Sequence, residues 1–344
     1  MKNRILYFDY LRVFSILAVI ILHIAAQNWY TVNYQTFEWK IFNLLDSMMR
    51  WAVPVFVMIS GALFLEREID IKKLYGKNIL RLITAFIFWS VIYAVIKGGT
   101  KGEIVANAII GHFHMWFIPM IIGVYILTPI LKEIVKNKKI MIYFVFSMIA
   151  FEFVIPQLCW ILNDIGGDKI QLLSVAFLKI LNKTNLSNFA GYTSYFVIGY
   201  WLNQMDLNKK HRHIIYALGI LGMLFTMGMT YGMAVMEGAP TEMYYEYISL
   251  NVLLESISVF IFVKYNAEKW GKINKLVFFL SECSFGVYLI HVLVLEQFKN
   301  TLQINTLSFN PLLSIPLLVA VIFIISLGMV MIIKKIPILN KYII

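Results

Sequence analysis

Three ionisable residues near the start of the chain have types and spacing suited to chemistry inside a membrane. Asp9, Arg12 and His23 lie in or beside an otherwise apolar run from Leu11 to Ala26. Such groups are costly in hydrocarbon and usually mark functional sites. Eleven steps along an α-helix bring a side chain back to within about 20° of its starting direction and raise it by roughly 16 Å along the axis. Arg12 and His23 therefore share one helix face. The pattern predicts a general base or nucleophile at His23, with Asp9 holding Arg12 across three residues.

Two other interpretations of this segment have a physical basis. A cleavable signal peptide would show a basic start, an apolar middle and small residues such as Ala25 and Ala26, but Asp9 and Arg12 interrupt the apolar region. The second is a packed helix whose histidine is satisfied by a neighbouring side chain. That structural alternative stays open from the sequence.

The composition indicates a membrane protein along its whole length. The 344 residues are 60% hydrophobic and 14% charged, against about 25% charged in soluble domains. No hydrophilic stretch is long enough for a separate soluble domain, so we predict an all-α, polytopic integral membrane protein with one domain, residues 1–344. With about 20 apolar residues per span, ten transmembrane helices are expected, at 10–28, 47–65, 78–96, 115–131, 139–157, 190–204, 212–232, 245–264, 276–298 and 310–333.

The basic residues predict the orientation of the chain. The terminal segments and four alternate connections hold 20 of the 30 lysines and arginines, which places both termini in the cytoplasm. The net charge of +11 then reflects this bias and contact with anionic membrane lipid rather than a nucleic-acid partner. Six of eight tryptophans, Trp29 and Trp39 among them, are expected toward the outer side, where an aromatic belt explains them. A sugar-stacking surface would need the same residues. Cys159 and Cys283 fall at opposite ends of their spans, so no disulfide bond between them is predicted. No metal-ligand spacing occurs, so no metal is predicted.

Basic residues at span ends are candidates for binding substrates. Lys77 and Arg81 are four residues apart and therefore share a helix face at the cytoplasmic end, level with Arg12. Together they are suited to phosphate groups, although each could serve as a membrane anchor. Arg50 begins the second span at the outer face, where a snorkelling side chain is the ordinary alternative.

Glu255 is the deepest carboxylate in the predicted spans. A buried glutamate needs a partner, and His23, His291 or a basic residue are all possible from the sequence. Intramembrane arginine, histidine and glutamate also occur in proton-coupled transporters of glycans or small molecules, which is the alternative function. The chain shows no internal symmetry of the inverted-repeat kind found in many transporters.

Several stretches in order resemble the acyltransferase-3 family of integral membrane acyltransferases. The first is the pattern Asp-x-x-Arg-x10-His in the first span. The later ones are Val53-Pro54-Val55-Phe56 with Ser60-Gly61, His114-Met115-Trp116-Phe117 running on to Thr128-Pro129, and Ser284-Phe285-Gly286-Val287-Tyr288-Leu289-Ile290-His291.

The resemblance implies a function and roles for these residues. The family transfers acyl groups, most often acetyl, from cytoplasmic acetyl-CoA or another acyl-CoA to a hydroxyl of a cell-envelope carbohydrate, in the plasma membrane. The implied catalytic residues are His23, Arg12 and Asp9, and Glu255 is a fourth catalytic candidate because it is the deepest carboxylate in the predicted spans. Arg12, Lys77 and Arg81 would bind the coenzyme A phosphates. Residues expected to bind the acceptor are Arg50, His114, Trp116, Tyr288 and His291.

Overall fold

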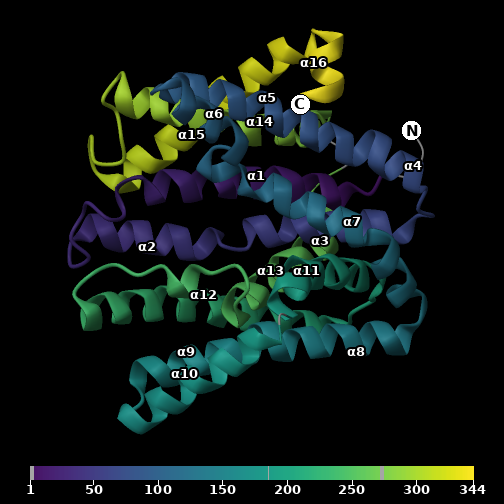
Figure 1. Ribbon diagram of the computed structural model, residues 1–344, viewed down its shortest axis with the longest axis vertical. Helices are drawn as coiled ribbons and strands as arrows, with labels where there is room; N and C mark the ends of the chain where they lie inside the picture. The colour runs from purple at the N-terminus through teal and green to yellow at the C-terminus, as the bar shows by residue number, and fades with distance from the viewer. Residues whose placement is uncertain (1–3, 185, 272–274) are drawn as a thin grey trace. The chain divides into compact units, whose positions relative to one another are not determined.

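The computed structural model describes residues 4–184, 186–271 and 275–344, and throughout that range the regular structure is helical, with no strand (Figure 1). In the described part, nine helical segments are long and apolar enough to cross a membrane. They match nine of the ten predicted spans, so the predicted all-α polytopic fold is confirmed. The remaining predicted span, the sixth at 190–204, lies in helix α11 (Leu186–Gln204), which is outside the nine. Its polar residues, such as Thr193, Ser194 and Asn203, account for the difference.

The chain forms two compact units, each built from separated stretches of sequence. The first unit comprises Met1–Gln27, Glu68–Pro129 and Gly271–Ile344. Its helices are α1 (Leu6–Ala25), α4 (Ile71–Lys73), the π-helix η2 (Leu74–Ile79), α5 (Leu80–Lys97), α6 (Lys101–Ile110), η3 (Phe113–Trp116), α7 (Phe117–Lys136) up to Pro129, α14 (Lys275–Asn300), α15 (Pro311–Lys334) and α16 (Pro337–Tyr342). Helix α1 packs against α14 and α15, and α5 packs against α6 and α16 (Figure 1).

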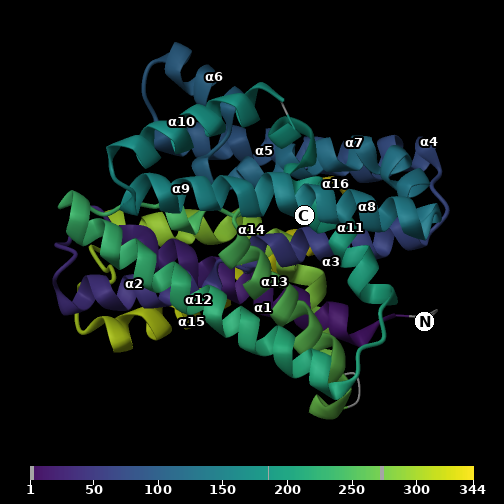
Figure 2. The same cartoon turned by 90° about the horizontal axis from the view of Figure 1, so that it is seen from below.

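The second unit comprises Asn28–Arg67 and Ile130–Trp270. Its helices are α2 (Phe37–Met49), α3 (Ala52–Glu66), α8 (Lys138–Met148), the π-helix η4 (Ile149–Val154), α9 (Ile155–Ile165), α10 (Asp168–Lys183), α11, α12 (Lys209–Glu237), η5 (Met243–Tyr245), α13 (Leu250–Asn266) and η6 (Ala267–Trp270); the short η1 (Ala26–Asn28) leads into it. Helix α12 runs beside α13, as Figure 2 shows, and α3 packs against α11.

Two glycines allow α3 and α11 to approach closely. A Cβ atom at Gly61 would meet the backbone of Phe196, and one at Gly199 would meet the backbone of Met58. Small residues at such contacts are typical of helix pairs in membranes, where close backbone packing replaces the hydrophobic effect as the source of association.

Trp29 and Trp39 belong to the core of the second unit, which corrects the prediction that they form part of an aromatic belt. Their side chains are 1% and 0% exposed, and their rings lie 4.4 Å apart. The ring of Tyr245 lies 5.3 Å from that of Trp29. Burial of three large aromatic side chains contributes more to packing than an interfacial position would.

The orientation in the membrane remains a prediction, and labelling can test it. Single cysteines placed at Ile170 and at Lys72 should react with a membrane-impermeant thiol reagent from opposite sides of the bilayer, because the basic residues place Lys72 in the cytoplasm. Both positions are exposed in the structure, so a lack of reaction would not be due to burial. Reaction of both cysteines from the same side would contradict the ten-span topology.

Candidate active site

His23 and His291 are hydrogen-bonded to each other within the first unit. His23 lies in the last turn of α1, and His291 lies on α14. Nδ1 of His23 is 2.7 Å from Nε2 of His291, and the two rings stack with centroids 5.0 Å apart. The packing of α1 against α14 therefore brings together two side chains that are 268 positions apart in sequence.

The hydrogen bonds of His291 decide which nitrogen of His23 is basic. Nδ1 of His291 is 2.8 Å from the carbonyl oxygen of Tyr288 and 3.2 Å from that of Val287. A carbonyl oxygen only accepts, so Nδ1 of His291 carries the proton and its Nε2 accepts from Nδ1 of His23. A neutral His23 then holds its lone pair on Nε2, the nitrogen that acts as a base or nucleophile.

His114 joins these two residues to form what we call the histidine cluster: His23, His114 and His291. His114 lies in η3 and is 1% exposed. Its ring centroid is 6.1 Å from that of His23 and 5.5 Å from that of His291. Tyr288 fixes the position of η3, since its hydroxyl donates to the carbonyl oxygen of His114 at 2.6 Å. Trp116 lies in the same short helix and is 37% exposed.

Two residues beside the cluster have contacts that the sequence did not predict. Nε2 of His112 lies 3.2 Å from a carboxylate oxygen of Glu296, and Nδ1 of His112 lies 2.8 Å from Nδ1 of His114. His112 also stacks on the ring of Tyr93, with centroids 4.3 Å apart. His112 and Glu296 line a cavity of about 520 Å³ together with Lys97 and other residues of α5, α6 and α14. Glu296 lies near the end of α14, and its spacing along the chain carries no signal for a contact with η3.

The opposite end of α1 carries a second polar group. The buried carboxylate of Asp9 accepts hydrogen bonds from Arg4 at 2.6 and 2.8 Å, from Arg12 at 3.3 Å and from the Ser281 hydroxyl at 2.6 Å. The predicted contact between Asp9 and Arg12 is confirmed. Asp9 lies 14 residues before His23, so its contacts make it a residue that positions Arg12 and joins α1 to α14.

Arg4 also belongs to this group, although it precedes α1 and its position in the sequence carries no signal for a contact with Asp9. Its guanidinium lies 3.2 Å from the centroid of the Phe278 ring and 3.2 Å from a carboxylate oxygen of Glu282. Burial opposes its charge, but the carboxylates of Asp9 and Glu282 outweigh burial and raise the pKa of Arg4 above its ordinary value. Arg4 therefore remains a cation.

The two other predicted phosphate-binding residues also lie in the first unit. Lys77 is exposed in the π-helix η2, and Arg81 follows in α5. Because a π turn is wider than an α turn, the four-residue spacing does not place them in register as a continuous α-helix would. Arg81 donates to the carbonyl oxygen of Ile344 at 2.5 Å, and its guanidinium lies 5.7 Å from the centroid of the Phe285 ring.

Arg50 is held by a buried ion pair in the second unit. Its guanidinium lies 2.7 Å from a carboxylate oxygen of Asp46, one helical turn earlier. It also lies 4.1 Å from the centroid of the Tyr245 ring and donates to the Tyr245 carbonyl oxygen at 3.3 Å. The side chain of Arg50 is 14% exposed and that of Asp46 is 2% exposed. Arg50 is therefore a buried group with protein partners and does not have the exposure of a snorkelling anchor.

Glu255 also lies in the second unit, and its partner is a hydroxyl group. One carboxylate oxygen accepts from Thr226 at 2.9 Å, and Asn251 donates to the same threonine oxygen at 2.7 Å. The sequence suggested a histidine or a cation for this role. Among the described residues, the second carboxylate oxygen of Glu255 has no hydrogen-bond partner.

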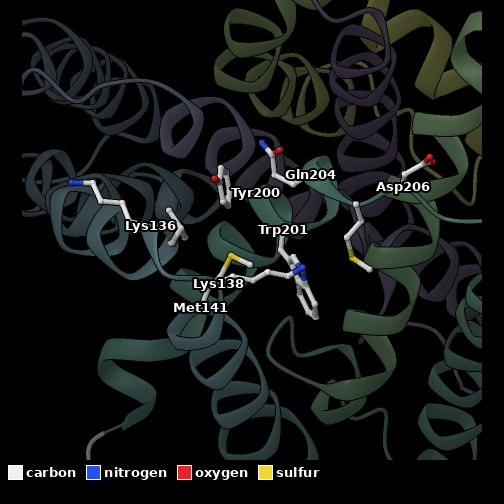
Figure 3. A pocket seen from close by; sticks show the side chains of 9 residues that line it. Lys136, Lys138, Met141, Tyr200, Trp201, Gln204 and Asp206 are labelled. Carbon is white, nitrogen blue, oxygen red and sulfur yellow. The ribbon is translucent and has the colours of Figure 1, made fainter.

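The second unit also holds a cavity of about 440 Å³ that contains none of the predicted site residues. Figure 3 shows the side chains that line it, including Lys136, Lys138, Tyr200, Trp201 and Asp206. Over the described ranges, no group of three or more histidine, cysteine, aspartate or glutamate side chains is arranged to hold a metal ion.

Comparison with known proteins identifies the family. A family model described as an acyltransferase domain, that of acyltransferase-3, matches residues 5–331. This range covers nearly the whole chain, from Asp9 at one end, through the histidine cluster, to most of α15 at the other. No curated protein and no solved structure matched.

Proposed function

Because the chain belongs to the acyltransferase-3 family of membrane acyltransferases, we propose that it moves an acetyl group from cytoplasmic acetyl-CoA to a hydroxyl of a cell-envelope polysaccharide or lipid-linked glycan. In this proposal the protein is a multi-pass protein of the plasma membrane. The observation that carries the proposal is the hydrogen bond between His23 and His291, which leaves the basic nitrogen of His23 at Nε2.

His23 would act on the acceptor hydroxyl in one of two ways. As a base, Nε2 removes the hydroxyl proton while the oxygen attacks the thioester carbonyl, and the carbon–sulfur bond then breaks to release a thiolate that takes the proton. As an acyl carrier, Nε2 itself attacks the thioester, and the carbon–sulfur bond breaks to release the thiolate. In a second step the acyl group passes from Nε2 to the hydroxyl oxygen, and the hydroxyl proton goes to the thiolate. Both routes need the same nitrogen, so His291 serves both by holding His23 in the required tautomer.

The donor would lie along α1. Arg12 and His23 share a face and are separated by eleven residues, or about 16 Å. A phosphate group bound near Arg12 would leave the extended pantetheine arm to carry the thioester toward His23. Asp9 would position Arg12, and Lys77 and Arg81 would add positive charge for the remaining phosphates. His114 and Tyr288 would border the acceptor hydroxyl, while roles for Arg50, Trp116 and Glu255 in acceptor binding or catalysis stay predictions.

The test is consumption of the donor by the purified protein in lipid nanodiscs. With labelled acetyl-CoA and a glycan fraction from the cell envelope, free coenzyme A should appear together with O-acetylated glycan. A proton-coupled transporter would leave acetyl-CoA intact, and that outcome would overturn the proposed function. Acetyl-CoA consumption with a different acceptor would correct only the acceptor.

We expect Arg81→Ala to weaken donor binding while the protein stays folded. Loss of one charge-assisted contact costs about 1.5–3 kcal/mol, or roughly ten- to hundredfold in affinity. The measurement is the Kd for coenzyme A in nanodiscs. Lys73→Ala, which removes an exposed positive charge from α4, is the control and should change the Kd less. Unchanged coenzyme A binding in Arg81→Ala would reduce Arg81 to an anchor for the main chain of Ile344.

A further inference from the structure

A chain of hydrogen bonds leads from the histidine cluster to the 520 Å³ cavity. It runs from His114 through the two Nδ1 atoms to His112, and from Nε2 of His112 to the carboxylate of Glu296. His114 is 1% exposed, whereas the Glu296 side chain is 36% exposed. This series of hydrogen bonds therefore connects the buried ring of His114 to the carboxylate of Glu296, which faces the cavity.

The other branch of the cluster ends differently. Nδ1 of His291 bonds to the carbonyl oxygens of Tyr288 and Val287, which accept a hydrogen bond but do not take up a proton. A proton that reaches this branch can go no further. Only the His112 branch ends in a group that balances an added positive charge.

The contacts of His112 are compatible with two arrangements that differ by one proton. When His112 is neutral, its Nε2–H donates to Glu296, and its Nδ1 accepts from Nδ1–H of His114. The lone pair of His114 is then on Nε2. When His112 is charged, it donates from both nitrogens, so His114 carries its proton on Nε2 instead. This nitrogen is buried and has no hydrogen-bond partner in the part of the chain that the structure describes. The heavy atoms need not move between the two arrangements.

We propose that Glu296, His112 and His114 store the proton that leaves the acceptor hydroxyl during acyl transfer. The hydroxyl proton passes to Nε2 of His23 and then to Nε2 of His114, a nitrogen without a hydrogen-bond partner among the described residues. The ring centroids of these two histidines lie 6.1 Å apart. The Nδ1 proton of His114 then shifts to Nδ1 of His112. His112 becomes a cation beside the ionised carboxylate of Glu296. The reverse shifts deliver the proton to the thiolate sulfur and restore the starting tautomers. This inference rests on the proposed function.

The groups around His112 support such a role. The titratable and charged groups that face it are Tyr93 and Lys97 from α5, His291 and Glu296 from α14, and His114 from its own segment. Glu296 is the only acidic group in this set, which covers the described residues around the cavity. Its negative charge is needed because a histidine cation beside Lys97 and two further imidazoles would otherwise be disfavoured.

The test compares Glu296→Gln with Glu296→Asp in the nanodisc assay. Glutamine keeps the size of the side chain and loses its charge, so kcat should fall by about 10²-fold, the lower end of the contribution from general acid–base catalysis. The KM for acetyl-CoA should stay close to the wild-type value, because the donor phosphates bind elsewhere. Aspartate keeps the charge and should recover part of kcat. A packing role would give the opposite order, with glutamine more active than aspartate, and would overturn the inference.

His112→Asn provides a second route if the Glu296 variants do not reach the membrane. Its amide oxygen can accept from His114 but cannot hold a proton, so it should show a similar loss of kcat. Adding Glu296→Gln to His112→Asn should then cause no further loss, whereas additive losses would contradict the inference. Glu237→Gln, at the exposed end of α12, is the control for loss of a carboxylate.

Measuring His23→Gln in parallel distinguishes a failure of the proposed acyl-transfer mechanism from a failure of the proposed proton store. An active His23→Gln enzyme would overturn the mechanism in the proposed function. An inactive His23→Gln enzyme with a fully active Glu296→Gln enzyme would overturn only the proton store.

Discussion

Replacing His23 with glutamine should abolish acyl transfer while the protein remains folded and binds acyl-CoA. Glutamine keeps a similar size and can hydrogen-bond to His291, but it cannot take a proton or carry an acyl group. Loss of a general base alone lowers kcat by about 10²–10⁴-fold. The measurement is O-acetylation of the glycan at equal amounts of protein in the membrane, with coenzyme A binding and thermal stability recorded for the same samples.

His213→Gln is the matched control for this substitution. His213 is exposed on α12, and its ring contacts the main chain of Lys209, so the variant should transfer acyl groups at the wild-type rate. Retained activity in His23→Gln would show that His23 has a packing role, and the mechanism would be wrong. Incubating the wild type with labelled acetyl-CoA in the absence of acceptor separates the two routes, because label bound to His23 indicates an acyl carrier and its absence a base.

Replacing Asp46 with alanine should lower the free energy of unfolding more than any other substitution proposed for this protein. The change leaves the Arg50 guanidinium buried beside the rings of Tyr245 and Tyr247 and the Tyr245 carbonyl oxygen, none of which carries a compensating negative charge. Removing one member of a buried ion pair typically costs about 3–5 kcal/mol, since an uncompensated charge remains. The measurement is the thermal unfolding midpoint in detergent, compared with that of the wild type.

The exposed pair Glu133 and Lys136 supplies the matched comparison. These side chains are 68% and 57% exposed, so Glu133→Ala should change the free energy of unfolding by less than about 1 kcal/mol. The double variant Asp46→Leu, Arg50→Met should recover most of the lost stability, because it removes both charges. If Asp46→Ala unfolds at the wild-type temperature, the pair is not the buried ion pair that its geometry indicates. Loss of transfer in a stable double variant would support a role for Arg50 toward the acceptor.

Features governed by local spacing could be predicted from the sequence. Nine of the ten spans follow from apolar runs of sufficient length, and the contact between Asp9 and Arg12 follows from their three-residue separation. Asp46 and Arg50 are four residues apart, and the same local rule predicts their ion pair from the sequence, although they were not singled out there as a pair. The sequence also indicated that Arg12 and His23 occupy one helix.

Contacts between distant elements could not be predicted in this way. The tautomer of His23 depends on α14 packing against α1 and on the carbonyl groups of α14 itself. Arg4 precedes the first helix, so no periodicity linked it to Asp9. The contact of Glu296 with His112 depends on where η3 meets the end of α14. In each case the partner is fixed by tertiary packing, which residue spacing does not contain.

The close packing of α3 against α11 at Gly61 and Gly199 has a consequence for how the chain enters the membrane during synthesis. Helix α11 is too polar to be among the nine apolar segments in the described part of the chain, whereas α3, which is made earlier, lies within one of them. The insertion of α11 in the bilayer therefore depends on α3, which is already inserted, and the two glycines allow the two helix backbones to approach closely. Replacing either glycine with alanine should therefore lower the fraction of newly made chains in which α11 is inserted in the membrane. This defect would arise during biogenesis, before any effect on catalysis.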